Sequence, residues 1–110
     1  MWDEIQDTLA DLDLALAKAK ERGLAMNIAE ASYYTVKDNR VRELIEEGKS
    51  ATVINLIIKG EPDGNEKMRK FHDMQVLYKN AIEAVNVYKK RLDTLREEYE
   101  REWNRAGMRE

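Results

Sequence analysis

The chain has 110 residues and a formal net charge of −3, with 43% hydrophobic and 37% charged residues. It contains no cysteine, one histidine, five glycines and one proline, which excludes disulfides and thiolate sites and argues against a turn-rich all-β fold. No apolar run reaches the roughly 18 residues of a membrane span and the N-terminus lacks the basic start of a secretion signal, so we expect a helical protein of the cytoplasm.

The first part of the chain has the apolar spacing of amphipathic helices. In residues 2–22 the apolar positions alternate at spacings of three and four, which is typical of one helix face. Gly23 follows where a C-terminal cap would lie, and Asn27 could open a second helix through a capping box. The pattern predicts two helices, 2–22 and 27–47, or one long helix kinked at Gly23. In either case, Gly48 is expected to end the helical segment.

A short apolar segment comes next. Within residues 51–59, positions 53–58 form an almost continuous apolar run, and Ser50 or Thr52 could cap a helix at its start. Their β propensity would also suit a strand, but no second strand is predicted for it to pair with. We therefore predict a short helix closed by Gly60, followed by a turn at residues 62–65.

The last part of the chain predicts the longest helix. Residues 65–106 keep the three-four alternation over four heptads without a glycine or proline. Such a helix would be about 63 Å long and would need an equally long partner, which residues 2–47 can supply. The expected fold class is all-α. We expect one domain, residues 1–110, built as a long antiparallel helical hairpin of coiled-coil type with a short cap helix at its tip.

The long helix carries more apolar residues than one hairpin should bury. The candidates for a core or dimer face are Leu77, Ile82, Val85, Tyr88 and Leu92. Because two helices alone bury too little surface for stability, we expect a homodimer that completes a four-helix core.

Charge is divided unevenly along the chain. Residues 1–47 hold 11 acids and 6 bases, a net −5, whereas residues 65–110 hold 11 bases and 9 acids, a net +2. Antiparallel helices would bring these two segments together. Exposed ion pairs contribute little stability each, about 0–1 kcal/mol, but they favour one orientation.

Motifs that suggest chemistry have simpler structural interpretations. Residues 48–50, Gly-Lys-Ser, match the end of a phosphate-binding loop, but Glu43 stands where that loop needs glycine and the preceding segment is helical. Glu43 and Glu46 have the spacing of half a helical Mg²⁺ site, and the second half is missing. The single histidine, His72, can form neither a zinc site nor a nucleophile–base pair by itself. We therefore predict no catalytic, cofactor-binding or metal-ligating residue, and no enzyme.

Basic residues gather around the expected tip of the hairpin. They are Lys49, Lys59, Lys67, Arg69 and Lys70. Nearby acids dilute this cluster, and the tyrosines that could stack on bases mostly lie on apolar stripes. Two hypotheses follow. The protein binds another protein through residues 48–64 or an exposed helix face, or it is an accessory nucleic-acid-binding protein that acts through the basic tip.

Residues 29–103 resemble small helical proteins encoded by bacteriophages and prophages of Gram-positive bacteria. The matching residues are Tyr34–Lys37, Leu44–Gly48, Ser50-Ala51-Thr52, Lys59-Gly60, Tyr78–Ala81 and Arg101-Glu102-Trp103. The resemblance implies a phage-type interaction protein in the bacterial cytoplasm, one that modulates DNA metabolism or host defence. It supplies no activity and no functional residues.

Overall fold

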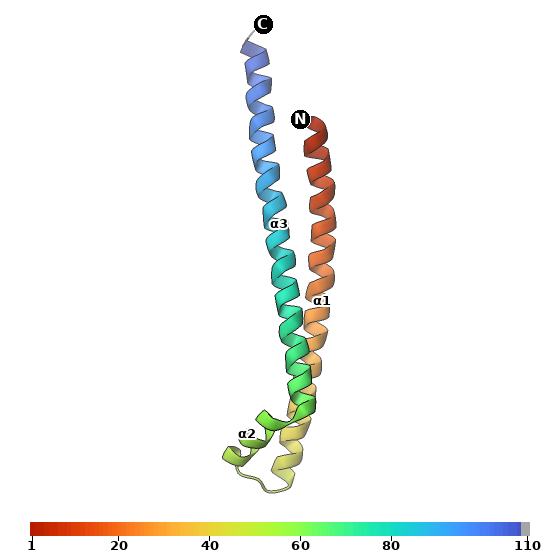
Figure 1. The fold of residues 1–110 in the computed structure, drawn as a ribbon, viewed down its shortest axis with the longest axis vertical. Helices are drawn as coiled ribbons and strands as arrows, with labels where there is room; N and C mark the ends of the chain where they lie inside the picture. The colour runs from red at the N-terminus through yellow and green to blue at the C-terminus, as the bar shows by residue number, and fades with distance from the viewer. Residues whose placement is uncertain (109–110) are drawn as a thin grey trace. The chain divides into compact units, whose positions relative to one another are not determined.

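The computed structural model describes residues 1–108, which form three helices and no strand (Figure 1). The helices are α1 (Trp2–Glu46), α2 (Ala51–Gly60) and α3 (Pro62–Met108). The expectation of an all-α fold is therefore confirmed for the described residues. The chain divides into two compact units, which are described one at a time.

Unit 1 combines Met1–Glu21 with Lys79–Glu110. Its core forms where the start of α1 packs against the later part of α3. Ile5, Leu92 and Leu95 are buried there, and Leu9, Leu12 and Tyr99 pack against them. The one polar side chain buried on this face, Thr8, donates a hydrogen bond from its hydroxyl to the Glu4 carbonyl at 2.8 Å. This local bond lets a polar residue occupy a core position of the helix.

Unit 2 combines the second part of α1, the whole of α2 and the start of α3, Arg22–Tyr78. Leu44 of α1 and Ile54 of α2 are buried in it. Eleven residues before Leu44 in α1, the Tyr33 ring stacks on Phe71 of α3, with the ring centroids 6.3 Å apart.

The link between α1 and α2 is built from two local hydrogen-bond motifs. Gly48 has a φ of +80°, and its N–H donates to the Ile45 carbonyl at 2.9 Å. The Lys49 N–H donates to the Leu44 carbonyl at 3.1 Å. Together these bonds form a Schellman helix stop. Ser50 then caps α2, and its hydroxyl accepts from the Val53 N–H at 3.3 Å.

Of the two alternatives for this segment, the division into helices 2–22 and 27–47 is wrong and the single long helix is confirmed, because α1 is continuous from Trp2 to Glu46. Gly23 does not have the positive φ of a C-terminal cap. It instead gives room to an aromatic ring, since a Cβ at this position would lie 3.1 Å from Cε2 of Tyr78. The glycine serves packing between α1 and α3.

The predicted turn at residues 62–65 is also wrong. α3 begins at Pro62 rather than at residue 65, and Glu61, with extended φ and ψ of −72° and 120°, alone separates it from α2. Proline suits the first position of a helix, because the N–H that it lacks would have no partner there. The Asn65 N–H already donates to the Glu61 carbonyl at 3.1 Å.

Burial predicts a large difference between two neighbouring residues of α1. The Leu44 side chain is 1% exposed and that of Ile45 is 60% exposed. We expect Leu44→Ala to lower the free energy of unfolding by about 2–5 kcal/mol, and Ile45→Ala to change it by about 0.5 kcal/mol or less. Urea unfolding followed by circular dichroism measures both. Equal losses would contradict the assignment of Leu44 to the core.

Backbone conformation predicts opposite effects at two glycines. Gly48→Ala places a Cβ in the left-handed region, and we expect a loss of about 1–2 kcal/mol and a lower Tm. Gly60 is helical, and no atom lies within 4 Å of a Cβ built there. Gly60→Ala should leave the Tm unchanged or raise it. A stabilising Gly48→Ala would rule out the Schellman stop.

Candidate functional site

A hollow of unit 2 is lined by residues from the end of α1, from α2 and from the start of α3. Figure 1 shows these three segments close together. We call this surface the α2 hollow. Its volume is about 640 Å³, within the range that binding pockets usually have. The lining residues used below are Tyr33, Val36, Lys37, Arg40 and Glu43 of α1, Ile58 and Lys59 of α2, Glu61, and Asp63, Asn65 and Met68 of α3.

Arg40 forms the polar centre of the hollow. Its Nε donates to Oε1 of Glu61 at 2.8 Å, and its Nη1 donates to Oε2 of Glu43 at 3.0 Å. The hydrogen bonds to Glu61 and then Glu43 raise the pKa of Arg40 above its usual value, so the guanidinium stays charged. A guanidinium suits this position because its donors are held in a rigid plane. Arg40 thereby ties α1 to the junction of α2 and α3.

The junction itself is fixed by two further bonds. The Glu61 N–H donates to the Ile58 carbonyl at 3.2 Å, and Nδ2 of Asn65 donates to the Lys59 carbonyl at 3.0 Å. These bonds satisfy carbonyls at the end of α2 that would otherwise lack partners. The backbone around Glu61 is therefore held in place.

The lining of the hollow combines apolar side chains with charged ones of both signs. Tyr33, Val36, Ile58 and Met68 supply the apolar surface. Two carboxylates, of Glu43 and Glu61, already pair with Arg40. The other charged residues of the lining are Lys37, Lys59 and Asp63. Lys37 in turn lies over the Tyr33 ring, with Nζ 5.9 Å from its centroid. The hollow therefore suits an apolar group better than a highly charged one.

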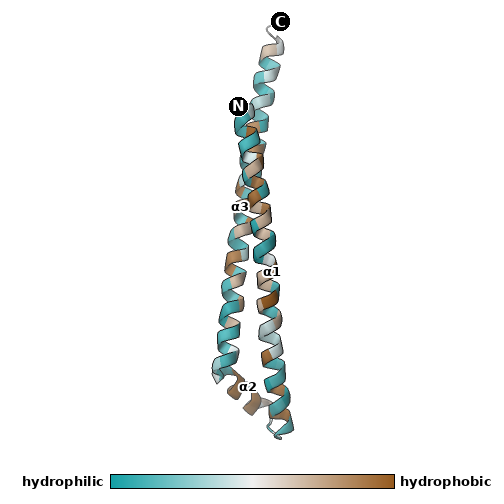
Figure 2. Ribbon diagram, turned by 90° about the vertical axis from the view of Figure 1, so that its right-hand side faces the viewer, coloured by the Kyte–Doolittle hydropathy of each residue, from teal (hydrophilic) through white to brown (hydrophobic). Residues whose placement is uncertain are grey.

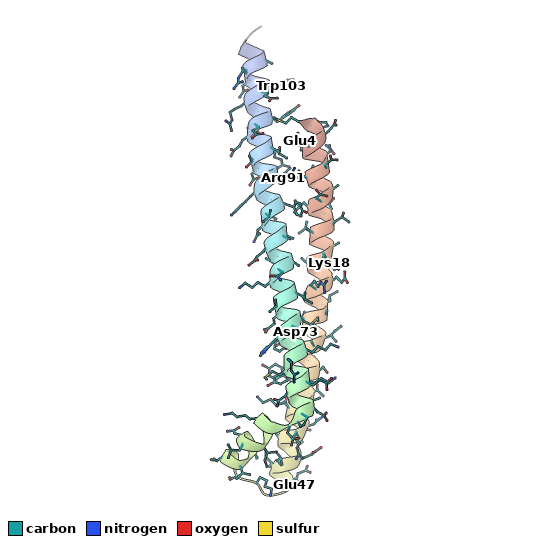
Figure 3. The ribbon with its side chains drawn as sticks, viewed as in Figure 1. Glu4, Lys18, Glu47, Asp73, Arg91 and Trp103 are labelled. Atoms are coloured by element: carbon teal, nitrogen blue, oxygen red, sulfur yellow. The ribbon has the colours of Figure 1, made fainter. Side chains whose placement is uncertain are left out.

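The outer face of α2 adds exposed apolar surface beside the hollow. Figure 2 shows α2 largely in the colours of hydrophobic residues. Ile54 is buried, whereas Val53 is 39% and Leu56 is 68% exposed. Charged residues lie near both ends of this helix. Glu47, labelled in Figure 3, lies in the link that leads from α1 to α2, and Lys59 lies in the last turn of α2. An apolar patch with a charged rim is typical of a surface that binds another protein.

The five basic residues of the sequence-based hypothesis lie in different settings. Lys59 lines the α2 hollow. Lys67 and Lys70 line a separate groove of about 220 Å³ between α3 and α1, which we call the α1–α3 groove. Lys49 lies in the link between α1 and α2, and Arg69 is exposed on α3. The structure thus brings Lys67 and Lys70 together, and it places Lys59 at another concave surface.

The candidate core or dimer face also separates into two groups. Val85 and Leu92 are buried, Leu92 within the unit 1 core. Leu77, Ile82 and Tyr88 are half-buried. Val85 and Leu92 are therefore core residues, which are not available to a second copy.

Sequence reasoning found the region of the site and missed its central contact. Residues 48–64 and Lys59 were singled out, and they form one side of the hollow. The contact between Arg40 and Glu61 was not predicted, because the two residues are 21 positions apart and no local pattern links them. Tyr33 carried a weak signal, since an aromatic residue on the apolar stripe of α1 was expected only to pack in the core.

Two other features, a metal site and a membrane-spanning helix, are not found in the part of the chain that the structure describes. Within residues 1–108, no group of three or more histidine, cysteine, aspartate or glutamate side chains could hold a metal ion. In the same range, none of the helices has a stretch long and apolar enough to cross a membrane. The chain matches no protein-family model, and no curated protein or solved structure is similar to it.

The two ion pairs of Arg40 should differ in their effect on stability. Glu43 lies on the same helix as Arg40, whereas Glu61 joins a different part of unit 2. We expect a double-mutant cycle of Arg40→Met and Glu61→Gln to give a larger coupling than one of Arg40→Met and Glu43→Gln. Urea unfolding measures both cycles. Equal couplings would mean that Arg40 does not fasten the α2–α3 junction.

Proposed function

We propose that the protein is a non-enzymatic protein-binding module whose partner docks on the exposed face of α2. The observation that carries the proposal is Leu56, which is 68% exposed on a short helix beside a hollow that is partly lined by apolar side chains. Binding energy at protein interfaces concentrates on a few apolar or aromatic anchors that enter such pockets. In this proposal the partner covers Val53 and Leu56 and inserts an apolar side chain between Tyr33 and Met68.

The charges around the hollow favour a protein over a nucleic acid. A nucleic acid is held mainly by basic residues that neutralise its phosphates. Here Glu61 and Glu43 already form ion pairs with Arg40. Asp63 lines the same hollow as Lys37 and Lys59. A protein with an apolar anchor and mixed charges fits this surface better. The sequence resemblance adds a context to the proposal, a host or phage protein in bacteria whose role lies in DNA metabolism or defence.

One observation favours the alternative of nucleic-acid binding, namely that Lys67 and Lys70 line the same groove. Titration of single- and double-stranded DNA across a salt series decides between the two. Binding that weakens steeply with salt supports contact with phosphates, and the changes Lys67→Glu and Lys70→Glu should then abolish it. Absence of binding at low salt would remove this alternative.

The proposal predicts that a partner contacts position 56 and not a comparable position elsewhere. A photo-crosslinking amino acid is placed at Leu56 and, as a control, at Val87, which is 63% exposed on α3 in unit 1. In a bacterial lysate, we expect an adduct with one bacterial protein from position 56 only. Leu56→Glu should reduce capture of that protein by about tenfold or more, and Val87→Glu should not.

Circular dichroism and Tm establish that both glutamate variants are folded. Adducts that form equally from both positions would contradict the proposal, because they would show adhesion to any exposed apolar residue. Capture that is insensitive to Leu56→Glu would place the partner on another surface.

A further inference from the structure

The α1–α3 groove of unit 2 has an uncharged side on α1 and a basic side on α3. Its lining residues are Ala25, Ile28, Ala29 and Ser32 of α1 and Lys67, Lys70 and Met74 of α3. Ile28 is 71% exposed, so most of its side chain is open to a ligand, whereas Ala29 is buried. The groove therefore offers an apolar contact beside two positive charges.

The stretch of α1 that borders the groove is poor in charge. Between Arg22 and Lys37 the one charged residue is Glu30, although 37% of the whole chain is charged. Arg22 and Glu30 are half-buried and do not line the groove. Lys37 lines the α2 hollow instead. No charge of α1 therefore competes with the two lysines for a ligand in the groove.

Exposed apolar residues extend this uncharged surface beyond the groove. Leu24, one turn before Ile28, is 56% exposed, and Ala31 is exposed as well. Their spacing of four and three places them on the same side of the helix as Ile28. Depletion of charged residues around exposed apolar ones is typical of the core of a protein interface.

Lys67 and Lys70 are available to a ligand. Asp63 is four residues before Lys67, and Glu66 and Asp73 are four before and three after Lys70, spacings at which ion pairs can form on a helix. Up to residue 108, however, no carboxylate forms an ion pair with either lysine, and none of these three acids lines the groove. The lining therefore carries two positive charges that an acidic ligand can neutralise.

We propose that the α1–α3 groove binds a short acidic and apolar segment of a partner protein. In this proposal an apolar side chain of the segment packs on Leu24, Ile28 and Met74. A carboxylate close to it in the segment accepts charge-assisted hydrogen bonds from Lys67 and Lys70. The exposed face of α2 is a different surface of unit 2, so this contact does not rest on the partner proposed for α2.

The size of the groove favours a side chain of a partner over a free small molecule. Its volume is about 220 Å³, whereas sites for small molecules usually have roughly 300–1,000 Å³. An apolar anchor of a protein needs only one such recess, because the rest of the contact lies on the surrounding surface. Leu24 and Ala31 supply part of that surface.

The acids beside the lysines disfavour a nucleic acid in the same groove. A nucleic acid is a continuous polyanion that is held by many basic residues. Here only two lysines line the groove, and Asp63, Glu66 and Asp73 on the same helix repel a phosphate backbone that runs past them. A protein segment with one or two carboxylates needs only the lysines, and it also gains the apolar contact with Ile28.

Selection of short random peptides against the folded full chain tests the chemistry of the ligand. Each selected peptide is tested again on Ile28→Glu and, as a control, on Val76→Glu, since Val76 is 58% exposed on α3 and does not line the groove. We expect a class of peptides that Ile28→Glu alone releases, rich in aspartate or glutamate and with a large apolar residue. If this class is not acidic, or if no peptide depends on Ile28, the proposal is overturned.

Charge reversal tests the two lysines with one selected acidic peptide, followed by fluorescence anisotropy. The double change Lys67→Glu and Lys70→Glu should raise the Kd about tenfold or more. Arg69→Glu, at an exposed base on the same helix outside the groove, should raise it much less. A peptide with lysine in place of each acid should bind the doubly reversed chain and not the wild type. Failure of this exchange contradicts the assigned contact.

A variant on α2 keeps the two proposed surfaces apart. Leu56→Glu should leave the affinity for the acidic peptide unchanged, because Leu56 does not line the groove. Circular dichroism and Tm establish that all the variants are folded. Loss of peptide binding in a folded Leu56→Glu chain would place the peptide on α2 and overturn the assignment to the groove.

Two other occupants of the groove are recognised by the same variants. One is single-stranded DNA, which would bind through Lys67 and Lys70, would be insensitive to Ile28→Glu, and would leave no acidic peptide to be recovered. The other is a second copy of the chain, which sedimentation equilibrium would detect as self-association that Ile28→Glu abolishes. Either result overturns the proposal of an acidic partner segment.

Discussion

The position of α2 depends on one arginine. Arg40 binds Glu61, the only residue between α2 and α3, and it binds Glu43 on its own helix. The chain can leave α1, form a ten-residue helix and enter α3 within a short stretch because the Schellman stop at Gly48 and the cap at Ser50 end one helix and start the next. Those local motifs set where the helices end, and the long-range bond of Arg40 sets where the junction lies. The α2 hollow exists because the local motifs at the helix ends and the long-range bond of Arg40 form together.

The periodicity and capping residues of the sequence predicted the features that depend on interactions between neighbouring residues. The all-α fold, the short helix near residues 51–59, the helix stop at Gly48 and the cap at Ser50 all follow from residues within a few positions of one another. The errors arose at Gly23 and at residues 62–65, where the outcome depends on context. Gly23 serves the ring of Tyr78, which is far away in the sequence, and Pro62 begins a helix because the extended Glu61 precedes it.

The contrast between local patterns and contacts of distant residues also explains how much of the candidate site could be predicted. The cap region and Lys59 could be named from composition and from the expected topology. The ion pair between Arg40 and Glu61 could not, since a contact between distant residues leaves no trace in local spacing. The surplus of apolar residues was also recognised, but the sequence assigned it to the long C-terminal helix. The structure buries Val85 and Leu92 of that helix, and it leaves apolar residues exposed on all three helices, Val76 and Val87 of α3 among them.

Ile54 is the one residue of α2 that is buried, and this gives the helix an unusual freedom. A segment held at its ends by backbone motifs and at one point by a side chain can exchange most of its other residues without loss of the fold. Selection for a new partner could therefore act on Val53, Asn55 and Leu56 while the scaffold beneath them stays constant. In the proposed role, α2 would be a replaceable recognition element, and its exposed positions would be those where related chains with different partners diverge first.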